Sequence, residues 1–443
     1  MHLANYFVRV LATLLGVGGV YWLDRRRPPR WVFALIGIGV LLFLIECVRQ
    51  AQPGGERFSD FIDAYYPAGV AAAHGDAAAL SAARGHGVFG FVNLPIVAYL
   101  FAPFGLLGPD AAALVFTALG VGLSVASWLL LVRLAGLQAR ERWLLAFLFI
   151  ADGPLLNSLM LGNTSQVVLL SLIGGLALIR SNRSAAGALL AATAVLKPPL
   201  MLFGLFFLLR RDVRGLAGFV VTGAAIAAAS LAVFGWDANL QWFETRVAPF
   251  GHDWVPAINM QSIYAFVSRL SLGPAVLSTW QAYPSTPAER ILADILTGIV
   301  FLSAGLAAMP RPAAATSERQ IGSRLELQYM LVICVALVTS PLSWYHYYAW
   351  LLLPTAFFLR SQASLPPLAR WLGWTAIVLT ALPFLWLSPS NPLLVRLYMS
   401  VVVSQCLFCG LIWCGLISWW LAESGGWLRG PRTLPIEASE AVA

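Results

Sequence analysis

Two acidic residues in the segment FSDFIDAYYPAG could act as a base on a hydroxyl group. Asp60 and Asp63 are three residues apart, so a helical turn would place both carboxylates on one face. A carboxylate in such a position can accept a hydroxyl proton as a general base, which contributes about 10²–10⁴-fold to a reaction rate. The surrounding Phe and Tyr side chains would shield the turn from water and so make a carboxylate more basic. The alternative is a pair of solvated loop acids.

Two basic side chains could bind a phosphate group. His346 lies among aromatic residues in SPLSWYHYYAW, beside Ser340 and Ser343, where it could bind phosphate or donate a hydrogen bond to it. Its alternative is a histidine of an interfacial aromatic belt. Lys197, in AVLKPPL, is an ionisable residue in an apolar stretch, which indicates anion binding or a structural role. Its alternative is a lysine that extends to a nearby membrane surface.

Other polar residues are weaker candidates, because each alone is more often structural than catalytic. They are Glu46, Asp152, Asp294, Asn259, Gln261, Arg269 and the Gly162-Asn163 pair. The sequence contains no glycine-rich phosphate loop, no HExxH and no GxSxG. It also lacks zinc or haem spacing and a clear acidic cluster for a divalent cation. We therefore expect no cofactor, the sequence leaves the need for a divalent cation open, and we disfavour a cytosolic nucleotide-driven enzyme.

The composition places these residues in a membrane. The 443 residues are 59% hydrophobic and only 11% charged, against roughly 25% charged for a soluble domain. Several apolar stretches reach or approach the ~20 residues that a spanning helix needs, whereas a β-barrel would show short alternating segments. We predict an all-α polytopic membrane protein, with one transmembrane domain over residues 1–421 and a cytoplasmic tail over 422–443. The five cysteines lie in apolar segments, so we expect them to be core residues without disulfides.

Arginine orients the chain across the bilayer. The net charge is +8, and 27 of the 28 basic residues are arginine. Because arginine concentrates in cytoplasmic loops, we attribute the charge to topology and expect no nucleic acid partner. The predicted inner loops hold 19 of these arginines, at 25–30, 133–142, 180–183, 210–214, 311–324, 360–370 and in the tail. The two large outer loops are then 49–90 and 235–287, and the C-terminus is cytoplasmic.

The same bias sets the spans. We read the apolar run at 10–23 as an uncleaved first segment, because no small-x-small cleavage site follows it. Residues 91–107 are short and broken by Pro95 and Pro103, so we predict a juxtamembrane or half-inserted segment on the outer side. Full spans are predicted near 31–48, 111–134, 143–160, 163–180, 215–234, 288–309, 325–344, 347–360, 371–387 and 394–421.

Residues 184–210 do not fit a pair of full spans. Both ends carry arginine and should lie inside, yet the stretch has about 26 residues where two spans need ~40. We predict a short or re-entrant helical hairpin, with Lys197, Pro198 and Pro199 forming its tip within the membrane.

The order of these motifs resembles glycosyltransferase family 87, in the GT-C superfamily. The motifs are DF…YY, F-x-N-x-P…AP, G-N, LKP before an RR pair, NMQS-x(6)-R and SPLSWYH, and they cover roughly residues 50–360. The resemblance implies a GT-C type helical bundle of about 10–13 transmembrane or half-membrane helices with outer-face juxtamembrane loops. It also implies an inverting enzyme of the bacterial inner membrane whose site opens to the periplasm. Its donor would be a polyprenyl-phosphate sugar such as mannose, and its acceptor a lipid or glycan hydroxyl.

The resemblance also suggests roles for single residues. Asp60 matches the family's catalytic aspartate in the first outer loop, His346 its junction histidine and Lys197 its LKP lysine. Asn163 departs from the family, in which many members have Gly-Gln at this junction. A leaving phosphate needs cationic or hydrogen-bonding partners where its charge develops. The candidates for contacts with the donor or its phosphate are His346, Lys197, Arg269, Arg246, Asn163, Gln261 and Asp63.

Three other functions remain open from the sequence. A transporter or lipid flippase would predict inverted repeats and charges near the midplane of several spans, and neither is seen. An outer-face polymerase or ligase of lipid-linked glycans would use arginines for a pyrophosphate leaving group. A membrane scaffold without activity would leave the DF…YY loop unexplained.

Overall fold

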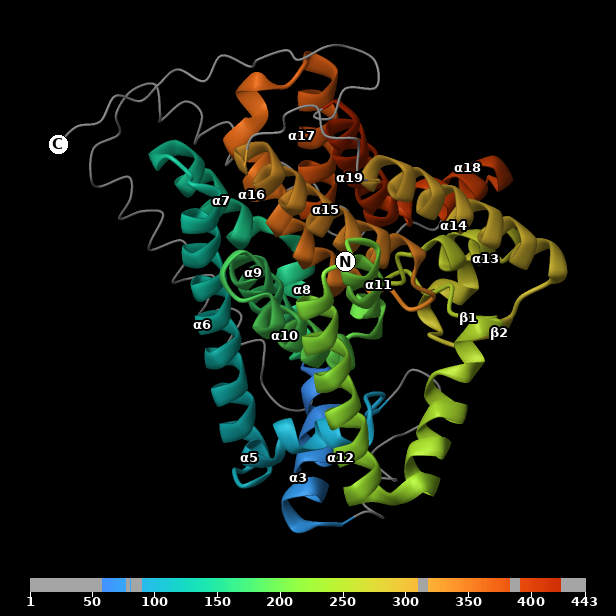
Figure 1. Ribbon diagram of the computed structural model, residues 1–443. Helices are drawn as coiled ribbons and strands as arrows, with labels where there is room; N and C mark the ends of the chain where they lie inside the picture. Colours follow the sequence, from blue (N-terminus) through green and yellow to red (C-terminus); the bar gives the residue numbers. More distant parts are fainter. Residues whose placement is uncertain (1–57, 77–79, 81–89, 310–317, 383–390, 424–443) are drawn as a thin grey trace, which may run out of the picture.

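The computed structural model describes residues 58–76, 80, 90–309, 318–382 and 391–423, and almost every element within them is a helix (Figure 1). The α-helices are α3 (Tyr66–His74), α5 (Ala102–Gly105), α6 (Pro109–Ala135), α7 (Ala139–Ala151), α8 (Gly153–Leu161), α9 (Ser165–Ser181), α10 (Arg183–Leu196), α11 (Leu202–Leu209), α12 (Val213–Arg246), α13 (Ile263–Ser271), α14 (Pro287–Ala308), α15 (Glu318–Thr339), α16 (Leu352–Ser361), α17 (Pro367–Ala381), α18 (Pro392–Leu397) and α19 (Gln405–Glu423).

Short 3₁₀ or π segments connect many of these helices. They are η1 (Phe61–Tyr65), η2 (Pro95–Leu100), η3 (Pro198–Met201), η4 (Ala248–Gly251), η5 (Pro274–Ser278), η6 (Tyr345–Leu351), η7 (Gln362–Ser364) and η8 (Tyr398–Val402). Two strands, β1 (Asp253–Trp254) and β2 (Tyr283–Pro284), form an antiparallel pair in which Trp254 lies opposite Tyr283. The all-α class predicted from the sequence is confirmed.

Four helices of the described chain are long and apolar enough to cross a membrane, namely α6, α12, α14 and α19. A fifth span is possible if α7 and α8 cross together, with a bend of 47° between them. The predicted spans 111–134, 143–160, 215–234 and 288–309 coincide with helices of this group. The helix α12 continues past the predicted end to Arg246, with a break at Gly235, where φ is +75°. The predicted polytopic membrane class is thus confirmed.

The helices α9, α15, α16 and α17 correspond to the other predicted spans and contribute most of the buried core. The predicted continuous span 394–421 is wrong, because the short helix α18 and the π segment η8 end at Val402 and α19 begins at Gln405. Side chains from a distant loop dock at this break. The side-chain nitrogen of Gln261 donates to the carbonyl of Val403, and its side-chain oxygen accepts from the backbone N–H of Cys406.

Residues 183–209 form the short helical hairpin that the sequence predicts. The arms are α10 and α11, and Lys197 with the prolines of η3 lies at the turn between them. The two ends of the hairpin lie together, since the Arg183 guanidinium is 3.7 Å from the Asp212 carboxylate. Small residues allow α10 to approach α12 closely, because a Cβ on Gly187 would lie 2.0 Å from the carbonyl oxygen of Gly215.

Residues 91–107 also form no long helix, as predicted, since they contain only η2 and α5. Four described cysteines, Cys334, Cys406, Cys409 and Cys414, are buried free thiols, in agreement with the prediction of core residues. The predicted first span 31–48, the apolar run 10–23, Glu46 and the tail from residue 424 lie outside the described residues.

The hairpin gives a topological prediction. Cysteines introduced by Ser181→Cys and Arg214→Cys are exposed at its two ends, so both should react with a thiol reagent only from the cytoplasmic side. A His252→Cys variant in the predicted outer loop should react from outside. Labelling of intact cells with a membrane-impermeant maleimide measures this, and outside labelling of position 181 or 214 would contradict the arginine-based orientation.

Candidate active site

The amide side chain of Asn163 joins the acidic motif that contains Asp60 to the basic motif that contains Lys197. The side-chain nitrogen of Asn163 donates a hydrogen bond to the Asp60 carboxylate, with 2.6 Å between Nδ2 and Oδ2. Its oxygen accepts hydrogen bonds from the Lys197 ammonium at 3.0 Å and from the backbone N–H of Thr164 at 2.7 Å. These donors fix the orientation of the amide, so that its nitrogen must point toward Asp60.

The turn between α8 and α9 holds Asn163 in this position. Gly162 ends α8 in the left-handed region, with φ at +67°, and the loop before η1 packs directly on it. A Cβ on Gly162 would lie 2.6 Å from the Cβ of Phe61 and 3.0 Å from the ring of Phe58. The backbone N–H of Phe58 donates to the carbonyl of Met160 at 2.7 Å. Glycine is therefore required here twice, for its φ angle and for the close approach of the Asp60 loop.

Lys197 is buried at the turn of the hairpin, with 4% of its surface exposed. Its ammonium lies 4.6 Å above the ring of Tyr347, in addition to its hydrogen bond to Asn163. The backbone before it is held by Asn93, whose side-chain nitrogen donates to the carbonyl of Leu196 at 2.9 Å. Asn93 is not among the residues predicted from the sequence, although it lies in the F-x-N-x-P motif, which was the signal for it.

His346 lies in the same region, on the segment η6. Its ring is stacked with Trp344 at 6.4 Å between centroids and meets the edge of Tyr347 at 5.0 Å. It is 4% exposed, and neither ring nitrogen has a hydrogen-bond partner among the residues that the structure describes. The ammonium of Lys197 is close enough to interact electrostatically with both Asp60 and His346. The structure thus brings Asp60, Lys197 and His346 together.

The environment of Asp60 alters its acidity. Asp60 is half-buried and lies outside the candidate spans. Burial raises the pKa of this carboxyl above its ordinary value, the hydrogen bond from Asn163 and the charge of Lys197 oppose the rise, and the charge of Asp63 adds to it. Asp63 itself is exposed on η1. A carboxylate with a raised pKa is a stronger base, as general base catalysis requires.

Arg269 and Gln261 are placed differently from these residues. Arg269 is 1% exposed, and its Nη1 donates to the carbonyl oxygens of Ala257 and Met260 at 3.2 and 2.9 Å. Its Nη2 donates to the hydroxyl of Ser404 at 3.0 Å. The Gln261 amide binds the backbone on both sides of the break before α19. These contacts fasten the 256–262 loop to the start of α19 and do not join either side chain to Asp60, Lys197 or His346.

The 256–262 loop in turn supports the segment that carries His346. The backbone N–H of Gln261 donates to the carbonyl of Ser343, and that of Tyr345 donates to the carbonyl of Asn259, both at 2.7 Å. An isolated bridge joins Met260 to Trp344. Arg269 therefore has no direct contact with His346, but it holds the loop whose backbone pairs with the His346 segment.

The remaining candidates are dispersed. Arg246 is buried as the last residue of α12, and its role toward a phosphate stays a prediction. Asp152 caps α8, since its carboxylate accepts from the backbone N–H of Leu155 at 2.7 Å. Asp294 is exposed on α14. Among the described residues, no group of three or more His, Cys, Asp or Glu side chains could hold a metal ion.

Comparison with known proteins decides the family. The sequence model of glycosyltransferase family 87 matches residues 91–341, which is more than half of the chain. The chain belongs to glycosyltransferase family 87. The matched region of this family-87 chain contains Asn93, Asn163 and Lys197, while Asp60 precedes it and His346 follows it.

Two curated relatives carry the same name, polyprenol-phosphate-mannose-dependent alpha-(1-2)-phosphatidylinositol mannoside mannosyltransferase. The protein of Mycobacterium tuberculosis is 28% identical over 281 residues, and that of Mycolicibacterium smegmatis is 28% identical over 283 residues. In both comparisons 59% of this chain is covered, and the chain spans about 60% of the length of the relative. No solved structure matches the chain.

The Gly162 turn gives a prediction in which the close approach and the φ angle can be separated. Gly162→Ala should destabilise the protein and lower its activity, because the new Cβ meets Phe61 and displaces the loop of Asp60. Gly136→Ala is the matched control, since Gly136 also has a positive φ of +64° but has no atom within 4 Å of the new Cβ. We expect the control to cost about 1 kcal/mol and Gly162→Ala clearly more. Thermal unfolding in detergent measures both, and equal losses would show that the close packing does not matter.

Proposed function

We propose that this family-87 chain is a membrane-embedded inverting glycosyltransferase. It moves a sugar from a polyprenyl-phosphate donor to a hydroxyl of a lipid or glycan acceptor, at the outer face of the inner membrane. The names of the two relatives support mannose as the sugar and a phosphatidylinositol mannoside, a lipid-linked glycan, as the type of acceptor. The single observation that carries the proposal is that Asn163 joins Asp60 to Lys197 by hydrogen bonds, while the ring of Tyr347 contacts both Lys197 and His346.

Asp60 acts as the general base. Its Oδ2 accepts the hydrogen bond from Asn163, and among the described residues the structure records no donor to its Oδ1. The second oxygen is therefore available to accept the proton of an acceptor hydroxyl. The deprotonating hydroxyl oxygen attacks the anomeric carbon of the sugar, while the bond from that carbon to the phosphate oxygen breaks. Attack on the face opposite the leaving group inverts the configuration at this carbon.

Lys197 and His346 receive the leaving phosphate. The electron pair of the broken bond stays on the phosphate oxygen, so negative charge develops there, and fixed cations or donors in a buried site stabilise it strongly. The Lys197 ammonium supplies the cation, and it is held by Asn163 rather than neutralised by a direct ion pair. The buried ring of His346, whose nitrogens have no partner among the described residues, can donate a hydrogen bond to the same phosphate.

The roles of the buried arginine and glutamine follow from their contacts. Arg269 and Gln261 position the His346 segment through the 256–262 loop, and the phosphate contacts fall to Lys197 and His346. Asp63 tunes the basicity of Asp60 from an exposed position.

The experiment that tests this function is incubation of the purified protein with polyprenyl-phosphate mannose and candidate acceptors, followed by mass spectrometry of the lipid products. A mannosylated acceptor and free polyprenyl monophosphate should appear together. Asp60→Asn should lower the transfer rate about 10²–10⁴-fold, equal to ~3–5 kcal/mol in barrier, because the amide cannot accept the proton. Asp63→Asn is the matched control and should cost much less, since Asp63 only influences its neighbour.

His346→Ala should raise the KM for the donor and lower the rate, because it removes a partner of the phosphate. Unfolding would affect all three variants equally, so the differences among them identify roles. An inactive Asp63→Asn with an active Asp60→Asn would show that the base is assigned wrongly. If neither substitution lowers the transfer rate, the DF…YY loop is only an interfacial turn and the proposed general base is refuted.

The charges around Asp60 predict shifts of the pH profile in opposite directions. The base works when deprotonated, so activity should be present above the pKa of Asp60 and disappear as the pH falls through it. Asp63→Asn removes a charge that raises this pKa, so the acid limb should move to lower pH. Lys197→Met removes a charge that lowers it, so the acid limb of its residual activity should move to higher pH. Rate–pH profiles of the wild-type protein and of the Asp63→Asn and Lys197→Met variants measure these shifts. Shifts of both variants in the same direction would refute Asp60 as the titrating base.

A further inference from the structure

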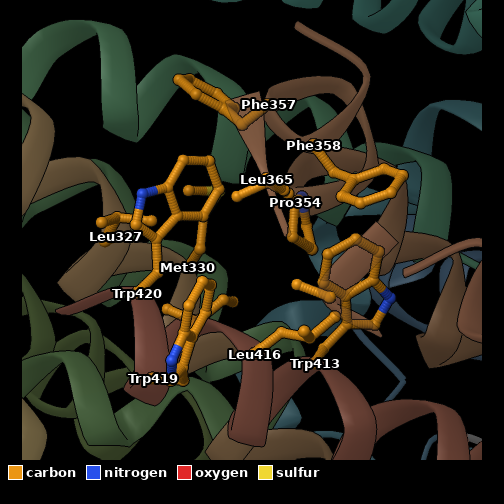
Figure 2. Close-up of a pocket in the computed structure, with 12 residues that line it drawn as sticks. Leu327, Met330, Pro354, Phe357, Phe358, Leu365, Trp413, Leu416, Trp419 and Trp420 are labelled. Atoms are coloured by element: carbon orange, nitrogen blue, oxygen red, sulfur yellow. The ribbon is translucent and has the colours of Figure 1, made fainter. Parts of the chain in front are cut away.

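A pocket of apolar side chains lies between α15, α16, α17 and α19, away from the candidate active site at Asp60, Lys197 and His346. Figure 2 shows the aromatic rings of Phe357, Phe358, Trp413, Trp419 and Trp420 arranged around it. The space between these rings is only about 10 Å³, so they form a closely packed apolar wall and leave no room for a ligand between them.

A second, partly polar cavity of about 200 Å³ adjoins this pocket. The two share the lining residues Leu327, Met330, Phe357 and Trp420. The second cavity adds Arg180, Glu326, Arg360 and Ser361 to its wall. Its volume corresponds to roughly six or seven water molecules, so it can hold a small polar head group. The charged cavity and the aromatic wall beside it form one amphipathic site, with an aromatic part and a charged part.

The charged part of this site carries a surplus of positive charge. Arg180 forms an ion pair with Glu326, whereas for Arg360 the structure records no partner among the described residues. More arginines lie at the same end of the bundle, since Arg210 interacts electrostatically with Arg183 and Arg324. The cavity therefore favours an anion, which the Arg360 fork can bind through two hydrogen bonds.

The helix α9 separates this site from the candidate active site. Its first residue, Ser165, follows the Asn163 turn directly, and Arg180 lies fifteen positions later at its other end. At 1.5 Å per residue the two ends are about 22 Å apart. The amphipathic site thus lies near the opposite end of the bundle, which the arginine distribution predicts to be cytoplasmic.

We infer that this amphipathic site binds one anionic phospholipid of the bilayer. The phosphate of the head group lies at Arg360, with Ser361 as a hydrogen-bond donor, and an acyl chain lies against the outer face of the aromatic wall, where Trp419 is 36% exposed. Basic cavities between helices at the cytoplasmic surface bind anionic head groups in this way. A soluble anion would have no use for the aromatic part, and the distance along α9 excludes the reacting end of the sugar donor. The inference does not depend on the transfer activity.

The test uses the full-length protein in neutral detergent and native mass spectrometry. Phosphatidylglycerol is the anionic probe and phosphatidylcholine the neutral control. One phosphatidylglycerol should bind per chain, with an affinity at least about fivefold above that of phosphatidylcholine. Arg360→Gln should remove this difference, a loss of about fivefold for one basic side chain. Arg370→Gln is the matched control, because Arg370 is an exposed arginine on the neighbouring helix α17 and lines neither cavity.

Two further variants test the two parts of the site separately. Ser361→Asp places a negative charge in the polar part and should also abolish the preference, which keeps the test decisive if Arg360→Gln does not fold. Trp420→Ala should weaken phosphatidylglycerol binding, whereas Trp371→Ala, at a tryptophan that is 73% exposed outside the cavities, should not. Equal binding of the two phospholipids would overturn the inference. So would binding that is insensitive to Arg360→Gln and Ser361→Asp.

Discussion

The bond network of the Asn163 amide is the interaction on which the candidate site depends. A carboxylate and an ammonium in a poorly hydrated site attract each other and would form a direct ion pair unless something holds them apart. Asn163 donates to Asp60 and accepts from Lys197, so it satisfies both groups through one neutral side chain. Within the described part of the chain, one oxygen of the carboxylate has no donor, and the ammonium keeps hydrogen atoms for a further acceptor. This geometry keeps a carboxylate and an ammonium group side by side without a direct ion pair between them.

The rest of the fold restrains the three segments that carry Asp60, Lys197 and His346. The Asp60 loop packs on the Gly162 turn, and the hairpin turn with Lys197 is tied to the outer segment by Asn93. The His346 segment pairs through its backbone with the 256–262 loop. Arg269 fastens that loop, because its guanidinium donates hydrogen bonds to backbone carbonyls and to the hydroxyl of Ser404. A buried charge can thus serve a site without facing it, by fixing the backbone that presents another residue.

The bundle has two chemically different ends. At one end, Asp60, Lys197 and His346 gather among aromatic rings around the start of α9. At the other end, arginines of several helices bind backbone carbonyls, pair with acids or line a cavity, as Arg324 does when it donates to the carbonyls of Met309 and Leu421. The helix α9 fixes the distance between the arginine-rich end of the bundle and the candidate site.

The sequence by itself determined the class of the fold, most helix positions and the family. Hydrophobic length and the placement of arginine are properties of single segments, and for this reason the short hairpin at 184–210 could be predicted from its ends and its length alone. Motif order also identified Asp60, Lys197 and His346, because their residue types are unusual in apolar surroundings. The sequence could not separate Arg269 and Gln261 from these residues, since a buried arginine on a phosphate and one on backbone carbonyls have the same signature in a single chain. Nor could it place the break before α19, which depends on side chains more than 130 positions away. Which polar groups meet, and which only hold a loop, was decided by the tertiary structure, because hydrogen bonds depend on positions fixed to a fraction of an ångström by contacts between distant segments.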